Sequence, residues 1–172
     1  MSWVDQVKEA LPDYAKDTKL NLDAVIKRSS ISEDIANACA LSAAMATGNG
    51  KLVSFISSSF AEDQFVLRDA ALTASAIMAA NNVWYPYVEM ADDEQLKGLP
   101  AQLRMNAIAS HGGTTKANFE AFSLAASIVG KCEFCVKAHY DGLKALGYTV
   151  EQLRDIGRIA AVMNSVAKVL NS

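Results

Sequence analysis

Apolar residues recur every three or four positions along almost the whole chain, and this spacing constrains the fold more than any other feature. Residues three and four apart lie on one face of an α-helix, whereas a half-buried strand alternates apolar and polar side chains. Sustained alternation is hard to find. Only the segment 83–88 has a strand-like composition, and Pro86 argues against a strand there. The sequence therefore predicts an all-α fold.

Capping residues and helix breakers divide this pattern into helices. Ser30–Glu33 and Thr149–Gln152 fit capping boxes, and Thr115 fits an N-cap. Pro12 should strain or end the first helix, and the pair Asn81-Asn82, with a proline soon after it, should end a long one. The predicted helices cover residues 4–14, 24–27, 30–48, 52–60, 63–80, 100–109, 115–130, 132–147 and 149–170.

The length and composition fit one compact domain. A chain of 172 residues with 51% hydrophobic content can close one sizeable core, whereas two domains would each be small. We expect a single domain over residues 1–172, with an N-terminal helical half (1–110) and a second half (111–172) that holds the cysteine pair described below.

The charge balance excludes some classes of partner. The net charge is -3 and the pI is near 5.4, so no excess of basic residues is available to neutralise the phosphates of a nucleic acid. The first residues carry no export signal, which predicts a cytoplasmic protein. The longest uncharged small-apolar run, residues 70–80, is well short of the ~20 residues that cross a bilayer, so no membrane partner is expected.

Two of the three cysteines form the motif Cys132-Glu-Phe-Cys135. If Cys132 lies in the first turn of a helix, Cys135 lies about one turn further on the same face, and the two sulfurs come within reach of a disulfide. The amides and dipole of a helix N-terminus stabilise a thiolate. The pair is therefore predicted to be redox-active, cycling between dithiol and disulfide.

A base and a carboxylate are candidates to serve this pair. His139 follows Cys135 by four residues, so it lies on the same helix face and can exchange a proton with that sulfur. Glu120 precedes Cys132 by twelve residues, and its carboxylate would orient His139 if the break at Gly130 folds two helices into an antiparallel pair. The order of carboxylate, imidazole and thiol is that of a nucleophile whose base is itself oriented.

Two other classes of protein use the same cysteine spacing. A structural zinc site would need two more ligands, and the remaining cysteine, Cys39, lies among small apolar residues that indicate simple burial. A helical interaction module with such a zinc site stays an alternative. A thioredoxin fold would require βαβ patterning, which this chain lacks.

The block from Glu120 to Gly147, with Cys132-Glu-Phe-Cys135 and Val136-Lys-Ala-His139, resembles the alkyl hydroperoxidase D (AhpD) family, within the carboxymuconolactone decarboxylase-like superfamily. The segments 10–17 and 19–22 resemble the opening of the same family, so the resemblance spans almost the whole chain. Members of this family carry a histidine directly before the second cysteine, where this chain has Phe134.

The resemblance implies an antioxidant, lipoyl-dependent peroxidase that acts on organic hydroperoxides. In the family, the thiol at the position of Cys135 attacks the peroxide, the thiol at Cys132 resolves the sulfenic acid to a disulfide, and Glu120 with His139 relays protons. Dihydrolipoamide on a lipoylated acyltransferase supplies electrons, and the dithiol passes them to the peroxiredoxin AhpC. No tightly bound cofactor or metal is implied, and the expected assembly is a homotrimer.

Two alternatives remain within this resemblance. The chain could be a disulfide reductase for AhpC with little peroxidase activity of its own, because Phe134 replaces the family histidine. A decarboxylase of the related carboxymuconolactone type would not need a redox pair.

Overall fold

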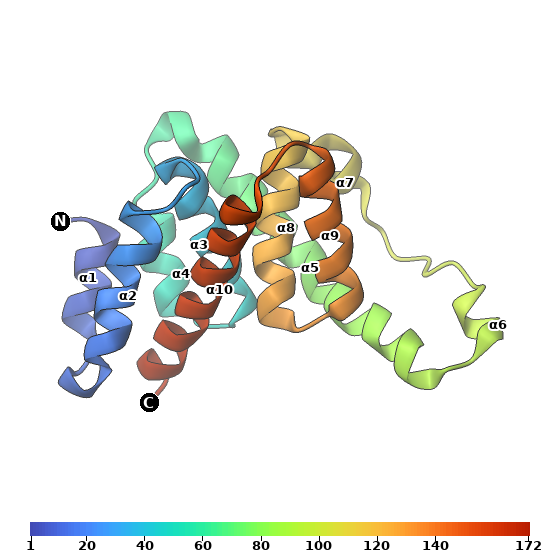
Figure 1. Ribbon diagram of the computed structural model, residues 1–172, viewed down its shortest axis with the longest axis horizontal. Helices are drawn as coiled ribbons and strands as arrows, with labels where there is room; N and C mark the ends of the chain where they lie inside the picture. The colour runs from blue at the N-terminus through green and yellow to red at the C-terminus, as the bar shows by residue number, and fades with distance from the viewer.

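The computed structural model describes residues 1–172 and contains only helices (Figure 1), as predicted. Short 3₁₀ turns lie at Asp13–Ala15, Glu62–Gln64 and His111–Gly113. The α-helices are α1 (Trp3–Ala10), α2 (Lys16–Lys27), α3 (Glu33–Ala46), α4 (Gly50–Ser57), α5 (Phe65–Ala91), α6 (Glu94–Lys97), α7 (Asn106–Ser110), α8 (Lys116–Gly130), α9 (Glu133–Ala145) and α10 (Val150–Leu170).

Helices α3 and α8 form the centre of the molecule and pack against each other. Both are built largely from alanine, serine and a few larger apolar residues, and most of their side chains are buried. Small side chains let neighbouring helices approach closely on every face, so α5 and α10 pack against both central helices. Helix α9 packs on α8 as an antiparallel hairpin, which brings the start of α9 to the end of α8 (Figure 1).

The C-terminal portion of α5 leaves this body. In Figure 1 it extends past α9 as an arm that continues into α6 and then returns to α7 through an extended segment. Several large apolar side chains on the arm are exposed, among them Val83, Tyr87, Met90 and Leu99.

The prediction that a helix ends at Asn81-Asn82 was wrong, because α5 runs through both residues and through Pro86 to Ala91. Tertiary contacts hold this stretch of the helix. Asn81 is buried, and the side-chain amide of Asn82 donates a hydrogen bond of 3.3 Å to the carbonyl oxygen of Ala126 on α8. Gly130 makes room for this amide, because a Cβ at position 130 would lie 2.1 Å from Asn82 Nδ2. Pro86 removes one backbone N–H from the helix, so the carbonyl of Asn82 has no intrahelical donor.

The capping box predicted at Ser30–Glu33 was also wrong. The N-cap of α3 is Ser32, and Ser30 instead donates its backbone N–H and its hydroxyl, both at 2.8 Å, to the buried carboxylate of Asp155 on α10. Burial alone would raise the pKa of Asp155, but the hydrogen bonds from Ser30, Arg154 and Arg158 hold this pKa at about 2. The carboxylate therefore ties the loop before α3 to α10.

Two further helix boundaries differ from the sequence predictions. The second helix begins at Lys16, not at residue 24, and residues 99–105 are not helical, so α7 starts only at Asn106. A short helix needs packing to form, and most of the residues from 99 to 105 are exposed. Pro12 ends the first helix as predicted, since Leu11 before it adopts extended backbone angles. Thr115 and Thr149 cap α8 and α10 as predicted.

None of the helices combines the length and the apolar character that crossing a membrane requires.

Candidate active site

The two cysteines of the motif open α9. Lys131 ends α8 in a left-handed backbone conformation, with φ 56°, and turns the chain into the next helix. Cys132 is the N-cap of α9, and its sulfur accepts a hydrogen bond of 3.2 Å from the backbone N–H of Cys135. The two Cα atoms are 5.3 Å apart and the two sulfurs are joined in a disulfide. The predicted positions at the start of a helix and the predicted bridging distance are confirmed.

The two sulfurs have different surroundings, and both are shielded from solvent. Cys132 is 0% exposed and Cys135 is 3% exposed. The Cys132 sulfur accepts a hydrogen bond from a backbone N–H of the first turn of α9. After reduction, this hydrogen bond favours the thiolate form of Cys132. The Cys135 sulfur lies 3.7 Å from the backbone carbonyl oxygen of Asn81 on α5, an acceptor that favours a protonated thiol.

His139 and Glu120 form a close pair across the helix hairpin. His139 Nδ1 lies 2.7 Å from Glu120 Oε2, and the side chains are only 17% and 19% exposed. Gly142 lies beside this contact, and a Cβ at position 142 would be at the ordinary contact distance of 3.4 Å from the same carboxylate oxygen. The antiparallel pair suggested by the break at Gly130 is present, and the carboxylate holds the imidazole as that suggestion required.

The other nitrogen of His139 does not face the disulfide. Nε2 lies 3.2 Å from the thioether sulfur of Met78 on α5, and no hydrogen bond joins His139 to either cysteine. Sequence reasoning missed Met78, which fits the apolar periodicity of its helix like any core residue. It also missed Asn81, which lies one turn further along α5. No local signal marks either residue, because their role depends on how α5 packs across α9.

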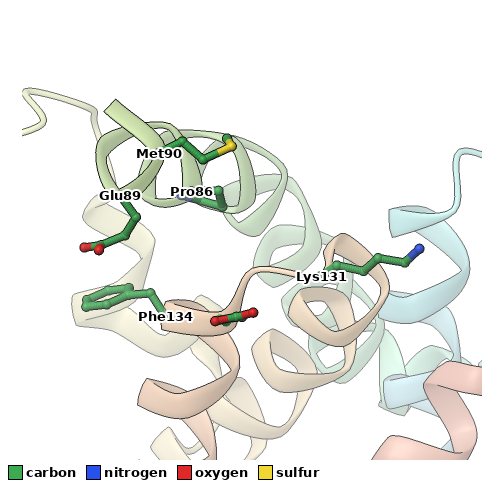
Figure 2. Close-up of a pocket in the computed structure, with 6 residues that line it drawn as sticks. Pro86, Glu89, Met90, Lys131 and Phe134 are labelled. Carbon is green, nitrogen blue, oxygen red and sulfur yellow. The ribbon is translucent and has the colours of Figure 1, made fainter. Parts of the chain in front are cut away.

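Phe134, which lies between the two cysteines in the sequence, forms a ring stack with α5. Phe134, 51% exposed, stacks on Tyr85 of α5 with the ring centroids 4.4 Å apart. Phe134 lines two pockets, one of about 300 Å³ and a more apolar one of about 400 Å³ lined by residues of α5, of α6 and of the segment after α6; neither pocket is lined by a cysteine. In Figure 2, Pro86, Glu89 and Met90 line the first pocket from α5, opposite Phe134.

The remaining candidates lie outside this cluster. Cys39 is fully buried in α3, and burial raises the pKa of its thiol far above the usual value, so it is unsuited to thiol exchange. His111 lies in the turn before α8 against Phe119. No group of three or more His, Cys, Asp or Glu side chains is placed to hold a metal ion, so a zinc site at the dithiol finds no further ligands in this chain.

Comparison with known proteins gives a family match over the C-terminal part of the chain and relatives that align with nearly all of it. Residues 94–172 match the Carboxymuconolactone decarboxylase family. The chain is 39% identical to the alkyl hydroperoxide reductase AhpD of Maricaulis maris, over 97% of this chain and 96% of that protein. It is 41% identical to AhpD of Coxiella burnetii, over 94% and 93% of the two chains, and 36% identical to AhpD of a Bradyrhizobium species, over 98% and 93%.

Proposed function

The chain belongs to the AhpD family of alkyl hydroperoxide reductases, within the carboxymuconolactone decarboxylase-like superfamily, and we propose that it reduces organic hydroperoxides by cycling Cys132 and Cys135 between dithiol and disulfide. The observation that carries this proposal is a cysteine pair at the start of α9 with a histidine–carboxylate pair one turn away.

In the proposed reaction Cys135 is the nucleophile. Its sulfur attacks the terminal oxygen of the hydroperoxide, the O–O bond breaks, an alcohol leaves, and Cys135 becomes a sulfenic acid. Cys132 then attacks the oxidised sulfur, so that the disulfide forms and water leaves. Two thiols and one hydroperoxide thus give one disulfide, one alcohol and one water.

The assignment of the two roles follows from the neighbours of each sulfur. Cys135 faces a backbone carbonyl and needs a base to lose its proton, and His139 follows it by one helical turn. Glu120 holds the proton on Nδ1, which leaves Nε2 to take the thiol proton and return it to the departing alkoxide. Cys132, whose sulfur receives a helix N-terminal N–H, is the better stabilised thiolate and serves as the resolving group.

The buried disulfide needs a reductant that can reach it. We propose dihydrolipoamide on a lipoylated acyltransferase as the electron donor, because a dithiol on a narrow flexible chain can approach beside Phe134, which lines two pockets. The donor is oxidised to its own disulfide as the pair at 132 and 135 is reduced. No other cofactor is called for. The peroxiredoxin AhpC is the proposed recipient when the reduced pair passes its electrons on.

The burial of both sulfurs also supports a second function, reduction of AhpC with little direct peroxidase activity. Phe134 stands where the family has a histidine, so no second imidazole assists the attack on a peroxide. Peroxide consumption by the reduced chain, measured with and without AhpC, separates the two functions. Fast consumption by the chain alone supports the peroxidase, and consumption only with AhpC supports the reductase.

The exposed arm of α5 supports a homotrimer as the proposed assembly, because a partner subunit would cover its apolar side chains. Sedimentation equilibrium gives the number of subunits directly, and a monomer at micromolar concentration would contradict this proposal. A cytoplasmic location stays a prediction.

Single-turnover oxidation by tert-butyl hydroperoxide tests the roles of the two cysteines. The reduced Cys132→Ser variant is expected to form a sulfenic acid at residue 135, trapped by dimedone, and the Cys135→Ser variant is expected not to react on the same timescale. Cys39→Ser is the matched control and should behave like the wild type. If Cys135→Ser is oxidised as fast as the wild type, the nucleophile is misassigned.

A further inference from the structure

Met78 occupies a position that the reaction described above does not use. It is 1% exposed, it lies on α5 one turn before the residue whose carbonyl faces Cys135, and its thioether sulfur is 3.2 Å from His139 Nε2. The nitrogen that must exchange protons with the thiol is thus directed at a methionine while the disulfide is closed.

The chemistry of the three groups fixes where the protons lie. A carboxylate only accepts hydrogen bonds, so the Glu120 contact places a proton on Nδ1 of His139. A thioether sulfur also only accepts. In a neutral imidazole, Nε2 would then present a lone pair to the lone pairs of Met78, and no hydrogen bond would form. When Nε2 carries a proton too, the same contact becomes an N–H···S hydrogen bond.

We propose that Met78 is a positioning residue that accepts the Nε2–H of His139 and keeps the imidazole in its doubly protonated form while the disulfide is closed. This inference rests on the proposed proton relay. The groups around the imidazole agree with this proposal. Glu120 on α8 is its one charged partner. The disulfide, one turn before His139 on α9, and the Met78 thioether on α5 are both uncharged. The site then holds a proton beside Cys135 before the reductant arrives.

This stored proton has a defined use. When a donor thiolate attacks the Cys132 sulfur, the S–S bond breaks and Cys135 leaves as a thiolate, which takes the Nε2 proton. The second donor thiol then attacks the mixed disulfide and releases Cys132. Of the two protons that the donor dithiol gives up, one goes to Cys132 and one is released to solvent, so the imidazole is left neutral and able to take the Cys135 proton in the next oxidation.

The protonation of His139 can be read by long-range ¹H–¹⁵N NMR on the oxidised protein, without turnover. The chain has two histidines, so a His111→Asn variant assigns the signals. Asparagine tolerates the left-handed backbone of position 111, where φ is 52°. Met78→Leu keeps the volume and removes the acceptor. At pH 6.5 we expect about a fivefold fall in the ratio of doubly to singly protonated imidazole, which corresponds to about 1 kcal/mol, the typical net worth of one hydrogen bond.

Two further variants make the result specific. Met78→Gln restores an acceptor at the same reach and should return the ratio toward the wild-type value. Met163→Leu alters a methionine that is equally buried but lies on α10 and makes no contact with His139, so it should leave the ratio unchanged.

The proposal is overturned if Met78→Leu, with its helical circular dichroism intact, gives the wild-type His139 spectrum throughout pH 5 to 8. That outcome says nothing against the peroxidase, because the measurement needs no peroxide. Conversely, wild-type oxidation rates in Cys135→Ser would remove the proposed nucleophile and leave the Met78 contact standing.

Discussion

The pair of Glu120 and His139 offers the sharpest test of the proposed relay. We expect Glu120→Gln to slow the oxidation of reduced Cys135 by tert-butyl hydroperoxide. The side-chain amide of Gln can still accept a bond from Nδ1, but it is neutral and can also turn its NH₂ toward the ring, which would favour the wrong tautomer.

The size of the effect follows from the geometry. The contact is 2.7 Å long and both side chains are less than a fifth exposed, so solvent screens it little. A charge-assisted hydrogen bond is worth about 1.5–3 kcal/mol and a neutral one about half of this, so losing the charge removes on the order of 1.4 kcal/mol. This corresponds to about a tenfold lower rate constant for Glu120→Gln, and Glu120→Ala should lose about ten- to a hundredfold.

The assay is rapid-quench oxidation of the reduced protein, with the remaining thiols counted at each time. Glu133→Gln is the matched control, since it makes the same change of charge beside Cys132 at an exposed side chain without a hydrogen-bond partner. It should stay within about twofold of the wild type. If Glu120→Gln and Glu120→Ala both react at the wild-type rate, the carboxylate has no role in the relay.

Four further results are expected from unfolding and turnover measurements. Thermal unfolding should show that Gly130→Ala destabilises the protein by about 1–3 kcal/mol, since the new methyl group displaces the Asn82 amide. The same measurement should show that Gly157→Ala stabilises the protein by about 0.5–1 kcal/mol, because position 157 lies in the middle of α10 with open space around it. The lowered pKa of Asp155 means that its contribution, about 2 kcal/mol, is complete above about pH 5 and is lost as the pH falls toward 2, so the stability to urea should fall more over this range in the wild type than in Asp155→Asn. Cys39→Ala should leave peroxide turnover unchanged, and a lower turnover with an intact fold would show that this buried thiol is involved.

The sequence was informative where a local signal decides the structure. Thr115, Cys132 and Thr149 each lie directly before an apolar-periodic segment, and each caps the helix that follows. The position of Cys132, together with the fixed spacing to Cys135, was enough to place both sulfurs at one helix end. His139 on the same face follows from the same helical geometry.

The sequence failed where tertiary contacts override local preference. Helix α5 continues past Asn81-Asn82 because α8 accepts a hydrogen bond from one of these side chains and leaves room for it at Gly130. Met78 was invisible for the same reason, since its partner His139 is 61 residues away in the chain. The division into halves at residue 110 stays a prediction, and α5 from the first half touches the cysteine pair of the second.

The burial of the disulfide makes this centre selective by access. A thiol exchanging with a disulfide must reach one of its two sulfurs, and in this conformation both cysteines are almost fully buried. We therefore expect abundant small thiols to reduce the oxidised protein slowly, whatever their reduction potential. The rate at which electrons pass through the chain should then depend on which molecule can reach these two buried sulfurs.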